Sequence, residues 1–119
     1  YRLTVSQIRE MSDSGLVSIQ SHTKSHTRID WMDREQLEEE CRMSRAVISG
    51  ITGKTPYVLS YPEGKYSRLS DTLVPEYFSF GLLDRGGTWR TGRVSMYRIP
   101  RTVVPRGMTL KQFAARVRQ

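Results

Sequence analysis

The chain has 119 residues, 37% of them hydrophobic, which allows one small domain with a modest core. Its 19 Lys and Arg against 12 Asp and Glu give a formal net charge of +7, which favours anionic partners such as an acidic glycan. No apolar run is long enough to span a membrane, and the scattered arginines, without a block of basic residues, argue against a nucleic-acid groove.

The first predicted elements are a helix and a strand. Thr4 followed by Gln7 is typical of a helix N-cap with its reciprocal partner, and the helical pattern that follows stops at Gly15. Residues 16–20 alternate apolar and polar side chains, which predicts a short strand. The segment S-H-T-K-S-H-T at residues 21–27 comes next and holds both histidines of the chain.

A long helix is predicted after the histidine segment. Asp33 and Gln36 form a second capping pair, and the apolar pattern continues to a stop near Gly50 or Gly53. Acidic residues crowd the first turns, where the helix dipole favours them: Glu35, Glu38, Glu39 and Glu40. Cys41, the only cysteine, excludes a disulfide framework and is predicted to be a small packed residue of this helix.

Three further strands are predicted, over residues 57–61, 77–83 and 96–104, with a short helix over residues 69–74. Strands that alternate with helices predict an α/β fold with a mostly parallel sheet. In such folds the functional groups gather at the carboxyl ends of the strands. Three features directly follow predicted strands and are expected at that edge: the histidine pair, the P-E-G turn at residues 62–64, and Asp84.

A last helix is predicted near the C-terminal end of the chain. Thr109 and Gln112 form its capping pair. Leu110, Phe113 and Val117 recur at helical spacing, so we expect these side chains to face inward.

His22 and His26 suit a divalent cation. Neutral imidazole is a common metal ligand, and a spacing of four places both rings on one side of a helical turn or compact loop. Thr23 and Thr27, which follow the histidines, are candidates for hydrogen bonds around the metal or to the local backbone. The alternative is a pair of polar loop histidines without a metal, because two ligands do not complete a zinc site.

These segments resemble the polysaccharide deacetylase family, the NodB-homology domains. The histidine segment matches the family's second motif, and Y-P-E-G-K-Y at residues 61–66 is similar to its third motif. Y-P-E-G-K-Y and the later Y-R-I-P-R are closest in style to members resembling exopolysaccharide poly-N-acetylglucosamine deacetylases. The resemblance implies that residues 1–119 form a single, partial domain, part of a distorted (β/α) barrel with mostly parallel strands alternating with helices.

The resemblance also implies an activity: metal-dependent hydrolysis of N-acetyl groups from an N-acetylglucosamine-type polysaccharide, at the cell envelope or otherwise outside the cytoplasm. The divalent ion held by His22 and His26 is expected to be zinc, with cobalt, nickel or iron as alternatives. Such an ion polarises the acetamide carbonyl and lowers the pKa of water.

In this family the turn after the third motif's strand stabilises the oxyanion. By resemblance the backbone N–H of Glu63, after Pro62, takes that role, and Gly64 lets the chain turn close to the substrate. Tyr61 stands where many relatives have arginine. Without the histidines, Y-P-E-G is an ordinary turn.

The chain departs from the family pattern in its acids and bases. The family's paired aspartate is absent, and there is no third histidine, so the third metal ligand, the general base and the general acid are missing. Asp84 is the best local candidate for a carboxylate near the ion, although Asp also suits the turn before Gly86. Trp89 is a candidate platform for sugar stacking, although a loop tryptophan more often covers core.

Because residue 1 is Tyr1 and not methionine, we expect the chain to be a piece of a longer protein or a processed form. A piece of a barrel would self-associate or pair with its missing N-terminal part, and would have little activity alone. The competing hypothesis is a non-catalytic module of the same fold that binds anionic glycan through its basic surface. The partner in both cases is a glycan and not nucleic acid.

Overall fold

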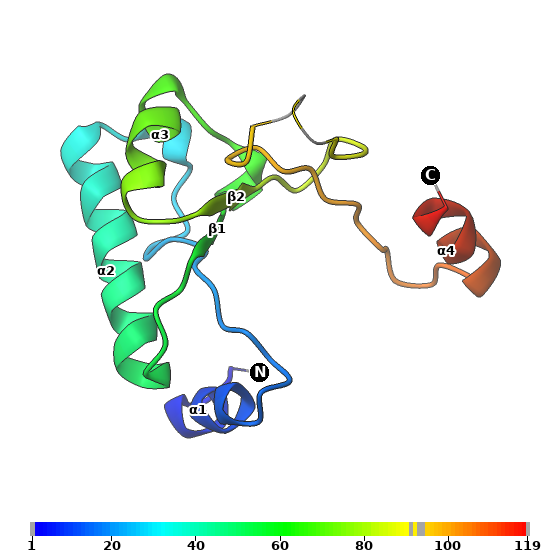
Figure 1. The fold of residues 1–119 in the computed structure, drawn as a ribbon, viewed down its shortest axis with the longest axis horizontal. Coiled ribbons are helices and arrows are strands. Elements are labelled where there is room, and N and C mark those ends of the chain that lie inside the picture. The colour runs from blue at the N-terminus through cyan, green and yellow to red at the C-terminus, as the bar shows by residue number, and fades with distance from the viewer. Residues whose placement is uncertain (1, 91, 93–94, 119) are drawn as a thin grey trace.

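The computed structural model describes residues 2–90, 92 and 95–118. A two-stranded parallel sheet of β1 (Val58–Ser60) and β2 (Phe80–Leu82) lies at its centre (Figure 1). Single parallel bridges extend the sheet on both sides, from Ser21 to β1 and from Ile99 to β2. The predicted α/β fold with parallel pairing is confirmed, whereas the described residues do not form a closed barrel.

Three of the four α-helices begin where the capping pairs predict. The four α-helices are α1 (Val5–Asp13), α2 (Arg34–Thr52), α3 (Arg68–Leu73) and α4 (Leu110–Val117). Each follows a capping box, in which the N-cap side chain and the third helical residue exchange hydrogen bonds with each other's backbone. α2 ends at Gly53, whose φ of 70° is the left-handed conformation of a helix stop.

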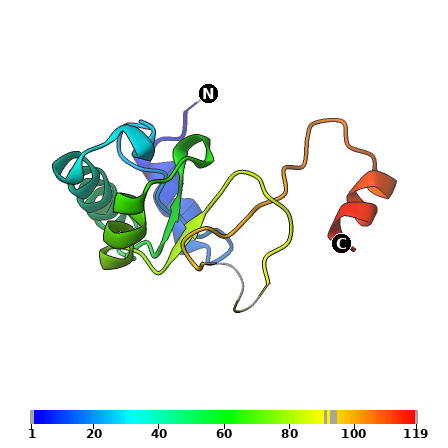
Figure 2. The same ribbon diagram turned by 90° about the horizontal axis from the view of Figure 1, so that it is seen from above.

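α2 and α3 pack beside the sheet, and α1 lies against the C-terminal end of α2 (Figures 1 and 2). The core between them is fully buried and mostly aliphatic: Ile29, Leu37, Cys41, Leu59, Leu73 and Val74. The prediction that Cys41 is a packed residue is confirmed, and its burial raises the pKa of the thiol to about 12. The side chain of Arg9 joins α1 to α2 by donating to the carbonyl of Ile51 at 3.2 Å.

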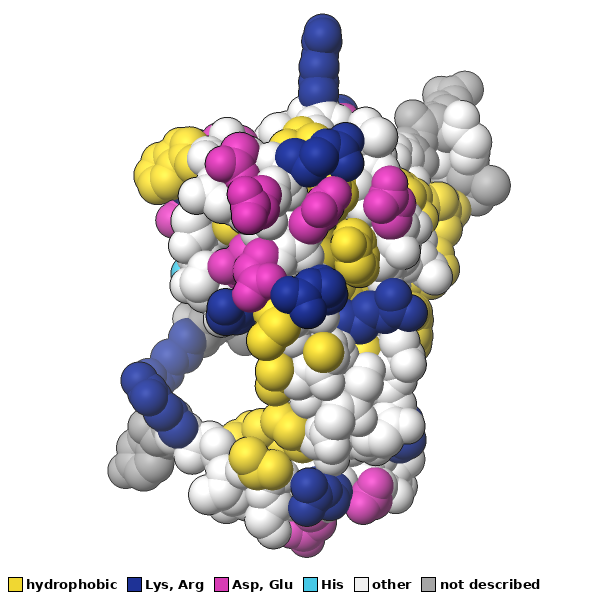
Figure 3. Space-filling view, turned by 90° about the vertical axis from the view of Figure 1, so that its left-hand side faces the viewer, with side chains coloured by type: hydrophobic (Ala, Val, Ile, Leu, Met, Phe, Trp, Pro, Cys, Tyr) yellow, Lys and Arg dark blue, Asp and Glu magenta, His cyan; other side chains and the backbone are white. Residues whose placement is uncertain are grey.

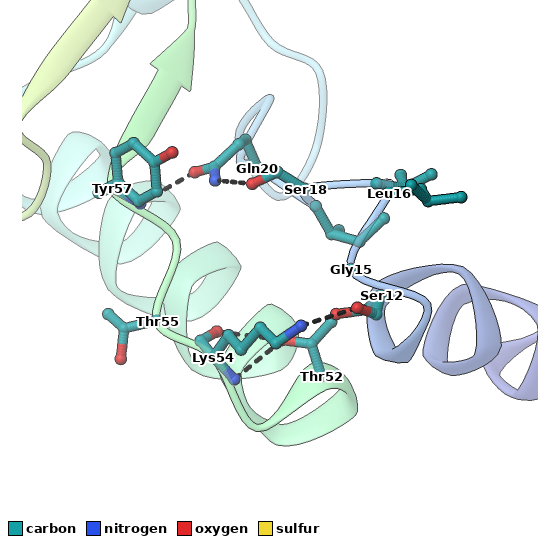
Figure 4. Close-up of a pocket in the computed structure, with 11 residues that line it drawn as sticks. Ser12, Gly15, Leu16, Ser18, Gln20, Thr52, Lys54, Thr55 and Tyr57 are labelled. Atoms are coloured by element: carbon teal, nitrogen blue, oxygen red, sulfur yellow. Dashed lines mark hydrogen bonds between the residues drawn. The ribbon is translucent and has the colours of Figure 1, made fainter.

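The strand predicted over residues 16–20 is not formed. The side-chain carbonyl of Gln20 accepts a hydrogen bond from the N–H of Tyr57 at 2.9 Å (Figure 4). It also accepts one from the N–H of Val58 at 3.0 Å. A side chain therefore satisfies the donors that a neighbouring strand would bond, and backbone pairing with β1 begins only at Ser21.

A hollow of about 270 Å³ lies beneath this segment, between α1 and the start of β1 (Figure 4). Lys54 crosses it and donates to the carbonyl of Ser12 at 2.7 Å. The hollow is at the amino ends of the strands, whereas the histidine segment is at their carboxyl ends.

The two later strands are shorter than predicted. Residues 77–79 form a turn and loop after the 3₁₀ helix Val74–Glu76, so β2 begins only at Phe80. Residues 96–104 form a bridge to β2 only at Ile99. The carbonyl of Leu83, which the next ladder bond would use, accepts instead from the side chain of Arg101. The close packing here requires Gly81, since a Cβ would collide with the hydroxyl of Tyr61.

α4 contradicts the prediction for its apolar face. Leu110, Phe113 and Val117 are 82%, 40% and 65% exposed, so they do not face inward. In both ribbon views α4 lies apart from the other helices, at the end of an extended segment (Figures 1 and 2). The spacing of apolar residues can predict an amphipathic helix, but whether the apolar face is buried depends on a surface for it to pack against.

Charge is mixed on the face that carries α2, where acidic and basic side chains are interspersed (Figure 3). Arg34 pairs with Glu38 at 3.3 Å and Arg42 pairs with Glu39 at 2.6 Å. This face therefore offers no continuous basic stripe. Among the helices that the structure describes, none has the length and apolar character needed to cross a bilayer.

Candidate active site

The three features expected at the carboxyl edge of the sheet follow neighbouring strand positions. His22 follows Ser21, the Pro62–Gly64 turn follows β1 after Tyr61, and Asp84 lies shortly after β2. Since all the pairings are parallel, these segments leave the sheet at the same end. The parallel topology thus brings together the segments that the sequence singled out.

The two imidazoles lie side by side. The ring centroids of His22 and His26 are 4.9 Å apart, with an angle of 63° between the ring planes, and both side chains are exposed. The Nδ1 atom of His22 lies 2.8 Å from the backbone carbonyl of Ser60, the last residue of β1. Because a carbonyl only accepts, Nδ1 carries the proton, and Nε2 of His22 is left as the nitrogen with a free lone pair.

The loop that carries the rings has an unusual backbone. Thr23 and His26 have φ values of 65° and 61°, in the left-handed region that β-branched and bulky residues rarely adopt. The Thr23 hydroxyl accepts a hydrogen bond from the His26 N–H at 3.1 Å. The hydroxyl of Thr27 lies 2.9 Å from that of Ser25. Thr23 thus bonds the local backbone and Thr27 a neighbouring side chain, while a role of either threonine around a metal stays a prediction.

α2 supports this loop through contacts that sequence reasoning missed, one of them an ion pair of Glu39 with Lys24 at 3.3 Å. The carboxylate of Glu40 accepts hydrogen bonds from the backbone N–H groups of Lys24 and Ser25, at 2.7 Å and 2.9 Å. One turn further along, the hydroxyl of Ser44 lies 2.7 Å from that of Ser21, and both are buried. The sequence signal for Glu40 was hidden, because four glutamates in the first turns share the helix-dipole explanation.

The Pro62–Gly64 turn has the backbone of a tight bend. Glu63 has a φ of 54°, and the N–H groups of Gly64 and Lys65 donate to the carbonyls of Tyr61 and Pro62. Among the described residues, these turn hydrogen bonds do not include the N–H of Glu63. Gly64 has a φ of 62°, and a Cβ there would collide with the Asp84 carboxylate.

Tyr61 is placed differently from the other candidates. Its side chain is fully buried in the core, and burial raises the pKa of its phenol. Within the described part of the chain its hydroxyl has no hydrogen-bond partner. The side chain therefore packs beneath the edge and does not line the surface beside the histidines.

Asp84 and Trp89 lie on the segment after β2. The Asp84 carboxylate packs against Gly64 of the P-E-G turn and accepts a hydrogen bond from Arg85 at 3.1 Å. Trp89 is half-buried, and within the described part of the chain its ring N–H has no acceptor. Their suggested roles beside the ion and the sugar stay predictions.

Arg101, the last residue of the Y-R-I-P-R segment, had no predicted role of its own. Its guanidinium donates to the carbonyl of Leu83 at 2.5 Å and to the hydroxyl of Ser60 at 2.7 Å. It therefore ties the end of β2 to the residue whose carbonyl holds His22.

The residues present fit two ligands of a divalent ion. Two adjacent imidazoles, one with its Nδ1 proton fixed by a carbonyl, are the donor set and the outer support typical of zinc sites. In the part of the chain that the structure describes, no group of three or more His, Cys, Asp or Glu side chains is arranged to hold a metal. Asp84 is thus not gathered with the histidines into a three-ligand cluster.

Comparison with known proteins gives consistent matches. A family model described as polysaccharide deacetylase matches residues 4–77, which include the histidine loop and the P-E-G turn. YxkH of Bacillus subtilis (strain 168), a relative assigned to the polysaccharide deacetylases, is 29% identical over 120 residues, covering 97% of this chain and 41% of that protein.

Solved structures give the same result for the fold. BC0361, a polysaccharide deacetylase from Bacillus cereus, has a TM-score of 0.90 and 29% identity over 97% of this chain and 36% of its own. IcaB from Ammonifex degensii has a TM-score of 0.79 and 22% identity, over 98% of this chain and 53% of its own. The chain therefore spans less than half the length of YxkH and of BC0361.

Proposed function

Because the chain belongs to the polysaccharide deacetylase family, we propose that the protein it represents removes N-acetyl groups from a polysaccharide by metal-dependent hydrolysis. The observation that carries this proposal is the placement of His22 and His26, with rings 4.9 Å apart at the carboxyl edge of the sheet. His22 is bonded to Ser60, two residues before the Pro62–Gly64 turn.

The residues of this chain would have two roles in this reaction, metal binding and stabilisation of the oxyanion. His22, through Nε2, and His26 would hold the divalent ion, for which we propose zinc, with cobalt, nickel or iron as alternatives. When bound, such an ion acts as a Lewis acid toward an amide carbonyl and toward water. The N–H of Glu63 would donate to the oxygen that becomes negatively charged as the acetyl carbon turns tetrahedral.

For the substrate we propose a glycan that contains N-acetylglucosamine, which chitin-like oligomers, peptidoglycan and exopolysaccharides all present. The support is the style of the 61–66 segment and of the Y-R-I-P-R segment. Such glycans are found outside the cytoplasm, so we propose an extracytoplasmic site of action, as a secreted, periplasmic or envelope protein.

One observation favours a second candidate, a non-catalytic module that binds anionic glycan. The described residues supply only two gathered ligands, and the chain carries a net charge of +7. Binding by such a module would weaken with salt and would not depend on the histidines.

Titration of the 119-residue chain with Co²⁺, followed by its visible absorption, tests the proposal. We expect uptake of the ion that is lost in His22→Ala and in His26→Ala, because each removes one of two adjacent ligands. The variant Thr102→Ala, at an exposed position outside the loop, is the control. Uptake that survives both histidine substitutions would contradict the metal site.

Acetate release from N-acetylglucosamine oligomers, measured with added Zn²⁺ or Co²⁺, tests the reaction. We expect little turnover by this chain alone, because the described residues gather no third ligand and no carboxylate base with the histidines. Rapid, histidine-dependent turnover would show that the two imidazoles suffice. Salt-sensitive oligomer binding that is indifferent to both substitutions would favour the binding module.

A further inference from the structure

We propose that Glu40 is a positioning residue: its carboxylate, reaching from α2, fixes the loop between His22 and His26 in the backbone shape that keeps the two imidazoles side by side. The inference rests on the proposed function, since it concerns the same histidine pair. The hydrogen bonds of Glu40 go to Lys24 and Ser25, two of the three residues between the histidines, so it acts through the loop backbone and not on the rings directly.

The contacts of Glu40 are concentrated on one short stretch. One carboxylate oxygen accepts from the N–H of Lys24 at 2.7 Å and from that of Ser25 at 2.9 Å. The other accepts from the hydroxyl of Ser25 at 2.6 Å. Two successive backbone N–H groups that converge on one anion form a nest, and hydrogen bonds to an ionised acceptor are about twice as strong as neutral ones.

The loop needs such support because its own backbone preference is unfavourable. Thr23 and His26, on either side of the nest, both have positive φ values, of 65° and 61°. A β-branched residue such as Thr23 leaves this region unless neighbouring contacts hold it there. If Thr23 relaxed, His22 and His26 would no longer face one another across the bend.

α2 presents Glu40 as part of a pair. Glu40 and Ser44 are four residues apart, so they lie on the same side of the helix, one turn from each other. Ser44 bonds Ser21 at the base of the loop, and Glu40 bonds its tip. The buried Leu37 and Cys41 pack this part of α2 into the core. The helix that holds the loop is therefore itself fixed in position.

Three substitutions of Glu40 distinguish the contribution of its side-chain length from that of its negative charge. Glu40→Ala removes both. Glu40→Gln keeps the reach and one carbonyl oxygen for the two N–H groups, but loses the charge. Glu40→Asp keeps the charge but is one methylene shorter. Glu38→Ala is the matched control, because Glu38 lies on the same helix and is paired with Arg34 instead of the loop.

The first readout needs no metal. In the wild-type chain we expect slow amide exchange at Lys24 and Ser25 and a nuclear Overhauser effect between the two imidazoles. In Glu40→Ala and Glu40→Asp we expect exchange near the rate of an unstructured peptide and loss of the ring contact. Glu40→Gln and Glu38→Ala should keep both signals. Wild-type behaviour of both Glu40→Ala and Glu40→Asp would overturn the proposal.

The second readout is the dissociation constant for Co²⁺. Glu40→Asp is expected to weaken binding by about tenfold, as is usual when a group that orients a metal ligand is altered, and Glu40→Gln by less. The reverse order would show that Glu40 acts through its charge, and would overturn a positioning role. If Glu40→Ala does not fold, the Asp and Gln variants decide the question alone. If the wild-type chain takes up no Co²⁺, the proposed function fails, and the metal-free readout still decides the role of Glu40.

Discussion

Helices α2 and α4 begin in the same way but have different surroundings. In each, the N-cap side chain and a glutamine three residues later exchange hydrogen bonds, through Asp33 in α2 and Thr109 in α4. α2 buries Leu37 completely, whereas α4 leaves Leu110 82% exposed. Local hydrogen bonds therefore fix where each helix begins, while tertiary packing decides how much each contributes to stability.

The strongest way to break this comparison is to remove a leucine from each helix. We expect Leu37→Ala to lower the free energy of unfolding by about 2–5 kcal/mol, because it leaves a cavity in the core. Leu110→Ala should change it by less than about 0.5 kcal/mol, since the side chain is already in water. Urea unfolding measures both, and equal losses would mean that α4 packs against a surface in solution.

The next effect is that of the caps. Asp33→Ala should cost about 1 kcal/mol of global stability, because the first turn of α2 loses a hydrogen-bond acceptor and α2 unfolds with the core. Thr109→Ala removes the same kind of bond, but we expect the loss only as fraying of α4. Thermal unfolding and the amide signals of α4 separate the outcomes. A lower global midpoint for Thr109→Ala would count against an isolated α4.

The smallest effect at neutral pH concerns Cys41. Burial raises the pKa of its thiol from 9.0 to about 12, so at pH 8 we expect almost no reaction with iodoacetamide until urea unfolds α2. The folded pKa lies above the unfolded value of 9.0, so the stability that the neutral thiol contributes is fully present below pH 9. This stability is lost as the pH rises from 9 toward 12, because the thiol ionises more readily in the unfolded chain. Rapid alkylation of the native chain would show that α2 opens locally.

The sequence was a good guide where the structure is local. The capping pairs at Thr4, Asp33 and Thr109 predict the starts of three helices correctly, because each bond joins residues three apart. The strand at residues 16–20 was predicted wrongly, because alternation cannot reveal that the side chain of Gln20 would take the place of a backbone partner.

The candidate site was predictable to the same extent. Parallel strand order places His22, His26 and the 62–64 turn at one edge, and this follows from the order of elements along the chain. The support from Glu40 was not predictable, because the contact joins residues 15 and 16 positions apart and depends on how α2 is rotated against the loop. The burial of Tyr61 likewise depends on long-range packing over Gly81.

The bond between Gln20 and the start of β1 affects how the chain meets other chains. A strand at the border of a sheet can template the addition of foreign polypeptide through its free amides, the first step toward fibrils. Here the amides of Tyr57 and Val58 are already occupied by a carboxamide from the same molecule. The side chain of Gln20 thus blocks these two amides against pairing with another chain, and an aliphatic side chain in its place would leave both amides free to do so.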